Sequence, residues 1–307
     1  MVKVFTAQNL VDLPQQVQQM IKEREGARAN NDFASSDQLR DAIKQAGYII
    51  NDRQDGYELL VVGDKDKKPD NNYLVLFGSG EIAPSSVDIY RSLFLTLGKR
   101  DLNIALITTP AGFQPNVEHV YGEIKDFLLA SLPDFNLTIN IAYANNKELA
   151  NDKTIVAELD SADIIFAGPG SPTYTVKNLS DTLLYAKVVD KVKAGASLIL
   201  ASAATLAFSK HCLPVYEIYK VGEDLHWIDG LNYYDPGATI IPHFNNREGG
   251  VDLDTSNCYI GQGRAQKMLA QLPRDEKVIG IDEHTAYIIN LKEDTNEVRG
   301  KGSIHEL

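Results

Sequence analysis

The sequence predicts an α/β protein with a mostly parallel sheet, covered by helices on both faces and preceded by a small helical hairpin. From Tyr73 onward, short apolar and β-branched runs alternate with segments of helix length. The runs show no polar alternation, as is typical of parallel strands buried on both faces. Before Tyr73 the apolar spacing is helical, which predicts a separate helical unit.

Residues 1–63 are interpreted as the hairpin. Val17 and Ile21 begin a single helical stripe, and after a polar ANND turn a second helical pattern ends at Gly47. A short extended piece is expected over residues 48–60. This unit therefore contains two helices before any long strand.

The charged, proline-containing segment 64–72 is expected to be a linker, and residues 73–307 the large domain. The predicted strands are 73–78, 103–109, 137–143, 162–168, 197–202 and 238–243. The predicted helices include 85–98, 115–132, 146–157 and 181–194. The tail after Lys277 is interpreted as two or three edge strands with hairpin turns.

Composition limits the function classes. The chain has 307 residues, a net charge of -12 and only two cysteines. The acidic balance disfavours a nucleic-acid surface and indicates a cytoplasmic protein. No export leader and no apolar run of about 18–20 residues is present, so no membrane partner is expected. No P-loop and no metal-ligand spacing is visible, so no cofactor is predicted.

Polar and glycine-rich residues follow four predicted strands, at the sheet edge where α/β proteins build sites. They are GSGE (78–81), AGPGSPTY (167–174), ASAAT (201–205) and PHFNNREGG (242–250). In the third, a strand breaks into a helix at a serine between small residues, as in a nucleophile elbow. Taken singly, each segment is also typical of an ordinary tight turn.

Taken together, AGPGSPTY, LILASAAT, PHFNN and GIDEHTA (280–286) resemble the dipeptidase E / cyanophycinase family of serine peptidases. The resemblance covers about residues 70–307 and lies in the order and spacing of the motifs. It implies a three-layer, flavodoxin-like domain of the class I glutamine amidotransferase type, with serine in place of the amidotransferase cysteine. It also implies a serine hydrolase.

By this resemblance Ser202 takes the nucleophile position and His243, in PHFN, takes the place of the general base. A serine hydroxyl needs such a base at neutral pH. The acid is expected between the two in sequence. Glu217 is the preferred candidate because it follows the serine by 15 residues, much as the family's acid does. Its rivals are Glu223, Asp224 and Asp229.

An oxyanion hole is expected from two backbone N–H groups. One belongs to Ala203 and the other to the turn at residues 168–170. Pro169 has no N–H, so Gly170 is the preferred second donor.

The sequence departs from the family pattern at three positions. Leu200 replaces a glycine two residues before the serine, and Ala204 replaces a glycine two residues after it. Ser171 replaces the polar residue that follows the family's glycine turn. An elbow strains the serine backbone and favours small neighbours. A catalytically inactive binding protein on the same fold therefore stays open as an alternative.

The resemblance implies a small acidic peptide or amide as the substrate. Arg247, four residues after His243, is a candidate to pair with a substrate carboxylate. Glu81 and Glu283 are expected to line the pocket or bind an amine, and Ser171 to contact substrate. The alternative for each is a residue that caps a helix or braces a loop.

The hairpin itself, IKEREGARANNDFASSDQLRDAIKQAGYIINDRQDGYE, resembles the C-terminal tail of cysteinyl-tRNA synthetase over about 45 residues. The shared pattern is an R-x-x-x-R pair, DFA, D-x-x-R-D and a final G-x-x-x-x-D. No HIGH-like or KMSKS-like sequence is present, so the resemblance does not extend to a synthetase.

Residues 21–58 hold six basic and eight acidic residues, so counterion release offers little general affinity for nucleic acid. A helical packing or homodimerisation module is the preferred interpretation of the hairpin. A local patch of Arg24, Arg28 and Arg40 keeps tRNA open as a partner.

Overall fold

The computed structural model describes residues 4–6, 13–53, 56–61, 69, 71–234 and 237–307. The chain divides into two compact units. The smaller contains residues 1–70, 91–101 and 133–136, and the larger contains the remainder. Residues 64–68 and 70 of the predicted linker lie outside the described residues.

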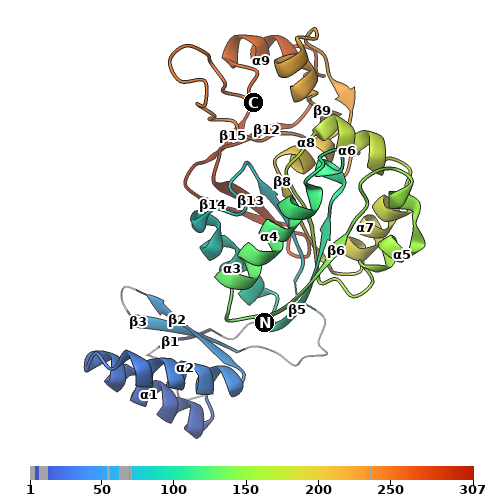
Figure 1. Cartoon of the computed structure of the whole chain (residues 1–307). Helices are drawn as coiled ribbons and strands as arrows, with labels where there is room; N and C mark the ends of the chain where they lie inside the picture. Colours follow the sequence, from blue (N-terminus) through green and yellow to red (C-terminus); the bar gives the residue numbers. More distant parts are fainter. Residues whose placement is uncertain (1–3, 7–12, 54–55, 62–68, 70, 235–236) are drawn as a thin grey trace. The chain divides into compact units, whose positions relative to one another are not determined.

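The N-terminal part is a helical hairpin joined to a small sheet (Figure 1). Its elements are β1 (Val4–Thr6), α1 (Gln15–Ala29), α2 (Phe33–Gln45), β2 (Tyr48–Arg53) and β3 (Gly56–Val61). The side chain of Asp32 accepts a hydrogen bond from the Ser35 N–H and caps α2. Gly47, at φ 88°, follows the helix in a conformation that favours glycine. The predicted hairpin is thus confirmed.

The expected extended piece forms two strands, β2 and β3, of an antiparallel sheet with the order β1-β3-β2. Apolar side chains of α1, α2 and the sheet meet in one core: Leu13, Val17, Ile21, Ile43, Ile50, Tyr57 and Leu59. Arg24 continues the Val17–Ile21 stripe and is also buried. A short two-helix unit becomes stable through such packing, because isolated helices of this length are marginal in water.

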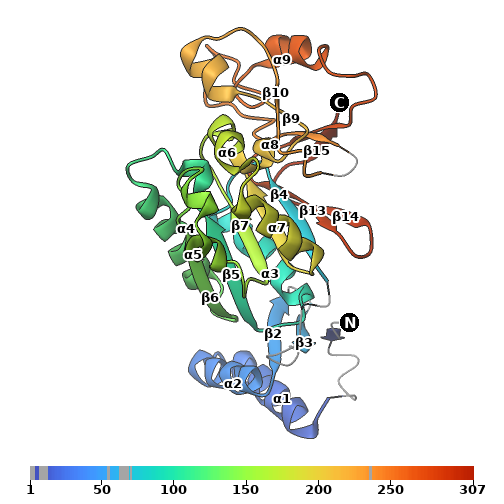
Figure 2. The same ribbon diagram turned by 90° about the vertical axis from the view of Figure 1, so that its right-hand side faces the viewer.

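A seven-stranded sheet with the order β14-β13-β4-β8-β7-β5-β6 forms the centre of the large unit (Figure 2). Its strands are β4 (Tyr73–Phe77), β5 (Asp101–Ile107), β6 (Asn136–Ala142), β7 (Ile164–Ala167), β8 (Ser197–Ala201), β13 (Thr285–Asn290) and β14 (Thr295–Gly300). β4, β8, β7 and β5 are parallel neighbours, whereas β13 and β14 run antiparallel at one edge. The predicted mostly parallel α/β fold is confirmed.

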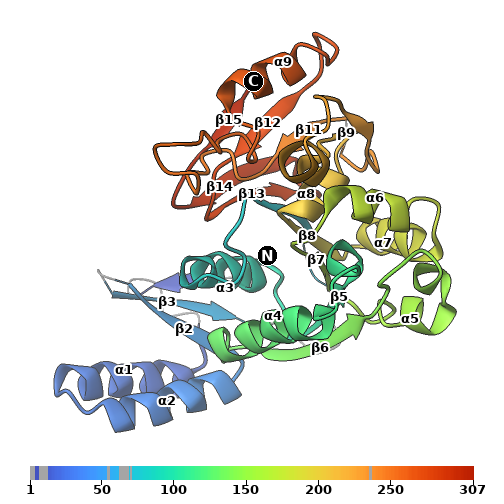
Figure 3. The ribbon, with the colours of Figure 1, turned by 45° about the horizontal axis from the view of Figure 1, so that its top comes forward.

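Helices cover both faces of this sheet (Figure 3). On one face lie α3 (Val87–Thr96) and α4 (Val117–Ser131), and the Tyr90 ring of α3 contacts Phe77 of β4. On the other lie α5 (Lys153–Ala157), α6 (Pro172–Leu179) and α7 (Leu183–Lys193). Short helical turns, Pro84–Ser86, Thr109–Ala111 and Leu149–Asn151, precede three of these helices. The alternation of strands and covering helices is what the sequence predicted.

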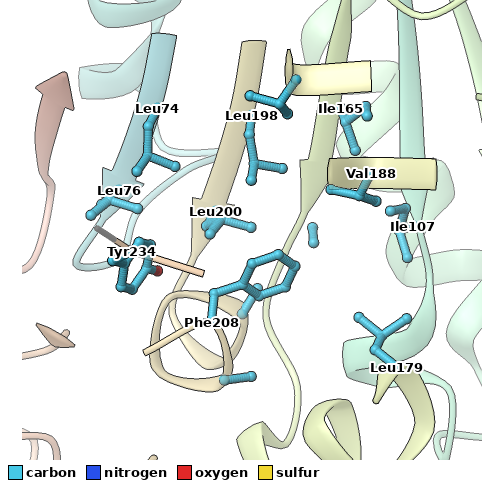
Figure 4. Close-up of a cluster of buried hydrophobic side chains, with 14 of the residues drawn as sticks. Leu74, Leu76, Ile107, Ile165, Leu179, Val188, Leu198, Leu200, Phe208 and Tyr234 are labelled. Carbon is cyan, nitrogen blue, oxygen red and sulfur yellow. The ribbon is translucent and has the colours of Figure 1, made fainter. Parts of the chain in front are cut away.

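Figure 4 shows the apolar cluster beneath α7, where Leu198 and Leu200 of β8 lie beside Val188 and Phe208. Leu200 is completely buried. A close-packed cluster of this kind fixes the end of β8, from which the chain turns into the short helix α8 (Ala203–Ala207).

The strand predicted at residues 238–243 does not join the main sheet. β11 (Thr239–Ile241) pairs in parallel with β12 (Val278–Ile281), which pairs with β15 (Ile304–Glu306) in a separate three-stranded sheet. The place beside β4 is taken by β13, paired over five residues. The remaining elements are β9 (His211–Cys212), the π-helix Glu217–Val221, β10 (Ile228–Asp229) and α9 (Gln262–Leu269).

Candidate active site

Ser202 lies in a sharp turn between β8 and α8. Its backbone has φ 51° and ψ −111°, a conformation that costs energy for any residue other than glycine. The Ser202 N–H donates to the carbonyl of Phe77 at 3.3 Å. Leu200 does not prevent this turn, because its side chain is accommodated in the core and not at the turn itself. The strained elbow therefore forms despite the missing glycine.

Ser202, His243 and Glu283 form a continuous hydrogen-bonded chain. The Oγ atom of Ser202 is 2.8 Å from Nε2 of His243, and Nδ1 of His243 is 2.8 Å from Oε1 of Glu283. His243 follows β11 and Glu283 follows β12, so two parallel neighbours of the small sheet present both side chains. The His243 N–H also donates to the carbonyl of Gly78, at the end of β4, at 3.1 Å.

The expectation that Glu217 would meet His243 is corrected. Glu217 begins the π-helix, and its Oε1 accepts a hydrogen bond from Thr173 Oγ1 at 2.6 Å, while its Oε2 is buried without a partner. The rivals Glu223, Asp224 and Asp229 are exposed on the chain that follows. The carboxylate that meets His243 instead follows it in sequence, because β12 and not the intervening loop lies beside β11.

Glu283 is held by more than the histidine. Asn246, which is almost fully buried, donates from Nδ2 to Oε1 of Glu283 at 2.8 Å, and Asn245 Oδ1 accepts the Glu283 N–H at 2.8 Å. The hydrogen bond from His243 holds the pKa of Glu283 below its usual value although burial opposes this, and the Asn246 hydrogen bond acts in the same direction. The two asparagines were not singled out from the sequence.

A left-handed turn braces the histidine. Asn257, Cys258 and Tyr259 all have positive φ, at 53°, 57° and 68°. The Cys258 N–H donates to the carbonyl of His243 at 3.2 Å, and the centroids of the Tyr259 ring and the His243 imidazole are 5.5 Å apart. Such backbone conformations persist only where the surroundings impose them, and they concentrate at functional sites.

The predicted oxyanion donors lie at neighbouring strand ends. β7 pairs in parallel with β8, so the 168–170 turn follows β7 beside the turn that holds Ser202. Gly170 has φ 150°, and a Cβ there would lie 1.9 Å from the Pro110 carbonyl oxygen, so no larger residue fits. The Ala203 N–H begins α8 and therefore has no intrahelical partner.

Ser171 serves first as a helix cap. It is nearly buried, its Oγ accepts from the Tyr174 N–H at 3.2 Å, and it is 2.9 Å from Thr173 Oγ1. Arg247 is exposed on the loop after His243. Glu81, by contrast, is buried, with only 7% of its surface accessible.

The described residues were also searched for a metal site and for a membrane-spanning helix. Among the described residues, no group of three or more His, Cys, Asp and Glu side chains is placed to hold a metal ion. Within the same residues, no helix is long and apolar enough to cross a membrane.

In the N-terminal hairpin, Arg24, Arg28 and Arg40 all bind the carboxylate of Asp52, and only 1% of the Arg24 side chain is exposed.

Comparison with solved structures identifies the fold. A peptidase from an acI-B1 Actinobacterium superposes with a TM-score of 0.61, at 24% identity, over 77% of this chain and 91% of that chain. A putative peptidase E protein from Listeria monocytogenes superposes with a TM-score of 0.50, at 16% identity, over 76% of this chain and 100% of that chain. This chain contains a peptidase E-type fold.

The N-terminal segment has different relatives. The model of the cysteinyl-tRNA ligase anticodon binding domain matches residues 10–58. Over 53 residues the chain is 38% identical to the cysteine–tRNA ligase of Methanosarcina acetivorans and 45% identical to that of Latilactobacillus sakei. Each match covers 17% of this chain and 11% of the ligase. The chain therefore spans only about a tenth of the length of these curated relatives.

Proposed function

We propose that the large unit is a serine hydrolase that cleaves a peptide or amide bond, with Ser202 as nucleophile, His243 as base and Glu283 as the orienting acid. The observation that supports this most is the hydrogen-bonded chain from Ser202 Oγ through His243 to Glu283, with both distances at 2.8 Å. Nucleophile, base and orienting group within this reach are the signature of an activated serine.

In the proposed reaction, Ser202 Oγ attacks the carbonyl carbon while His243 Nε2 accepts the hydroxyl proton. Glu283 keeps the proton on Nδ1 and stabilises the imidazolium. His243 then returns its proton to the leaving amine, and an acyl-enzyme ester remains on Ser202. Water repeats the sequence, with His243 again as base, and releases the acid.

The N–H groups of Ala203 and Gly170 are the proposed oxyanion donors. Gly170 forms no hydrogen bond through its N–H with any residue that the structure describes. In serine hydrolases where one such preorganised donor has been removed, kcat falls by a factor of about 10²–10³. Ser171 lies directly after this turn and is the proposed polar contact for substrate.

The proposed substrate is a small peptide or amide. Arg247 lies four residues after His243, is exposed and forms no ion pair among the described residues, which leaves its guanidinium available for a substrate carboxylate. The acidic character of the substrate rests on the resemblance to the dipeptidase E / cyanophycinase family.

The test is labelling with a fluorophosphonate probe, followed by intact mass and peptide mapping. We expect one adduct per chain, on Ser202, and none in Ser202→Ala. Ser209→Ala is a matched control, because Ser209 is a buried serine of the same segment that only hydrogen-bonds the backbone. A folded protein that takes no adduct would contradict the proposal and favour a binding protein on a hydrolase fold.

We propose as a second function that the N-terminal unit contacts tRNA. The match of residues 10–58 to an anticodon binding domain supports this. Arg24 is too buried to reach RNA, but Arg28 and Arg40 are 41% and 39% exposed and both contact Asp52, while Arg40 also pairs with Asp37 at 3.9 Å. Three arginines against two carboxylates leave a local positive excess.

Fluorescence anisotropy with a tRNA transcript tests this second proposal. We expect binding at low salt that weakens about tenfold or more when Arg28 and Arg40 are both changed to alanine, because phosphate contacts and counterion release are lost. Equal binding by the double variant, or a unit that only forms homodimers, would contradict it.

A further inference from the structure

β14 is an outer strand of the seven-stranded sheet, so one of its two edges is unpaired within the described chain (Figure 2). All of its residues except Arg299 are exposed, and Val298 keeps 40% of its surface accessible. Its register with β13 runs from Thr295 to Gly300 without a bulge, and the strand contains no proline. Bulges and prolines commonly block edge strands, so their absence here leaves this edge open to another strand.

The backbone groups on the open edge belong to Asn296, Val298 and Gly300. In an antiparallel pair, the N–H and C=O of one residue point to one side and those of the next residue point to the other. Directly beyond the ladder, the Lys301 N–H donates to the carbonyl of His284 at 2.9 Å. Lys301 and every second residue before it therefore point toward β13. The backbone groups of the other three residues point outward and bond no other described residue.

A second copy of β14 fits this edge around a two-fold axis. When two identical strands pair antiparallel, hydrogen bonds form only if outward-pointing residues lie opposite one another. With Val298 opposite the partner's Val298, these two residues exchange both N–H···O bonds. Asn296 then pairs with the partner's Gly300 in the same way, so each outward group of the strand gains a bonding partner.

The charged side chains of β14 favour this register over its neighbours. Glu297 and Arg299 lie on the same face of the strand, with Oε1 and Nε 2.9 Å apart. With the axis at Val298, each of these charges lies directly opposite its counter-charge on the second copy, which is attractive. An axis at Glu297 or at Arg299 sets two like charges opposite each other, which is destabilising. An axis nearer either end of the strand pairs fewer residues.

The opposite edge of the sheet does not have this self-complementary pattern. β6 contains no charged residue, so no charge pair selects a register there. Pairing through one strand edge buries less surface than a standard protein interface, and we therefore expect a weak dimer.

We propose that two copies of this chain associate through β14, in an antiparallel pair centred on Val298 that joins their sheets into one continuous sheet. The inference concerns assembly and does not depend on the proposed hydrolase function. It uses a surface other than the N-terminal hairpin. An extended segment of another protein would add to the same edge without this two-fold register.

Cysteine crosslinking of the full chain tests the register. Val298→Cys places the two Cα atoms about 5.5 Å apart across the axis, within reach of a disulfide. We expect most of this variant to become a covalent dimer under oxidation by copper phenanthroline in air. Asn296→Cys is the matched control on the same face, because its Cα atoms would lie more than about 10 Å apart. The native Cys212 and Cys258 are buried, so the unmodified chain should not crosslink.

Sedimentation equilibrium tests the charge pattern. We expect the native chain to dimerise with a dissociation constant of about 1–100 µM. Glu297→Arg sets like charges opposite each other and should weaken the dimer about tenfold or more, as should Arg299→Glu. The double variant, with both charges exchanged, restores opposite charges and should return to within about threefold of the native constant. This rescue also shows that the single changes do not act by unfolding the protein.

A chain that stays monomeric at about 500 µM would overturn the inference and leave this edge to an extended segment of another protein. A dimer whose dissociation constant is unchanged in Glu297→Arg would overturn it as well, because that dimer must form through another surface. Equal crosslinking of Val298→Cys and Asn296→Cys would overturn the register centred on Val298.

Discussion

Ser202 stores backbone strain at the position where a nucleophile would be presented. With φ 51° and ψ −111° its Cβ crowds the backbone, and in this turn Oγ lies 2.8 Å from His243 Nε2. Six of the ten non-glycine residues with positive φ in the described chain belong to the segments around this site: Ser202, His243, Asn257, Cys258, Tyr259 and His284. Backbone strain that is concentrated around one site indicates that the geometry of the site was selected at the expense of the stability of the fold.

The strain has a measurable consequence. Ser202→Gly and Ser202→Ala both remove the hydroxyl, but only glycine relaxes at positive φ. We expect the glycine variant to be more stable than the alanine variant by about 1 kcal/mol in urea unfolding, even though glycine costs more entropy on folding. An alanine variant equal to or more stable than the glycine variant would show that the elbow is not strained.

The structure places Ser202 and His243 in hydrogen-bond contact, as the sequence led us to expect, but the carboxylate that meets His243 is Glu283 and not Glu217. Ser202 was found because a strand breaks into a helix at a small, polar residue, a local signal. The acid depends on which strand lies beside β11, which is a non-local pairing. The signal for Glu283 was present, since VIGI is a buried strand that ends directly before Asp282 and Glu283. The family resemblance, however, placed the acid between Ser202 and His243 in sequence, which favoured Glu217 over Glu283.

At the scale of elements, one buried carboxylate joins the strands behind the site. Glu276 precedes β12, and its side chain is fully buried. It accepts hydrogen bonds from Lys210, His211 and Thr239 at 2.8–2.9 Å. These contacts link β9 and β11 to the entry of β12. His243 follows β11 and Glu283 follows β12, so the network helps to fix the relative position of these two side chains.

Burial raises the pKa of Glu276, but the hydrogen bonds from Lys210, His211 and Thr239 outweigh it and hold the pKa below its usual value. A carboxyl whose pKa is lower in the folded than in the unfolded protein stabilises the fold at every pH above the unfolded-state pKa. This contribution is lost as the pH falls through the folded-state pKa. We expect Glu276→Gln to be less stable than native by about 2–4 kcal/mol at pH 7. The difference should shrink below about pH 4.5.

Urea unfolding of the two proteins at a series of pH values measures this. Glu118→Gln, on an exposed carboxylate of α4, is the control and should unfold like the native protein throughout. A stability difference that stayed constant down to pH 3 would contradict an ionised Glu276 in the network.

The strand order shows the same limit of sequence reasoning at this scale. Buried parallel strands were predictable from their unbroken apolar runs, and β4, β5, β7 and β8 follow the prediction within a few residues. The run at 238–243 has the same composition, but which sheet it joins depends on distant partners. β13 occupies the edge beside β4, so β11 pairs with β12 and carries His243 out to the site.

At the scale of the molecule, the N-terminal part has an apolar core of its own, formed by side chains between Leu13 and Leu59. In the small unit Arg24 binds Asp52 with three hydrogen bonds of 2.8–3.1 Å while almost fully buried. Arg28 reaches the same carboxylate at 3.0 Å from an exposed position. The pair therefore offers a matched comparison of buried and exposed arginines on one partner.

We expect Arg24→Ala to destabilise the small unit by about 2–4 kcal/mol, because it leaves a cavity and removes the buried partner of Asp52. Arg28→Ala should cost less than about 1 kcal/mol, since exposed ion pairs contribute little. Hydrogen exchange measures both. Arg24→Ala should speed exchange in residues 13–53 and leave residues 197–208 unchanged, and equal effects of the two variants would contradict this.

The measurement that tests the central claim most directly is the second-order rate of fluorophosphonate labelling at Ser202 in Glu283→Gln and Glu217→Gln. Glutamine keeps the shape of each side chain but holds the wrong imidazole tautomer if it faces His243. The hydrogen-bonded chain predicts a loss of about 10³–10⁴-fold for Glu283→Gln and a change within about threefold for Glu217→Gln. Near-native labelling in Glu283→Gln, with collapse in Glu217→Gln, would contradict the assignment of Glu283 as the acid.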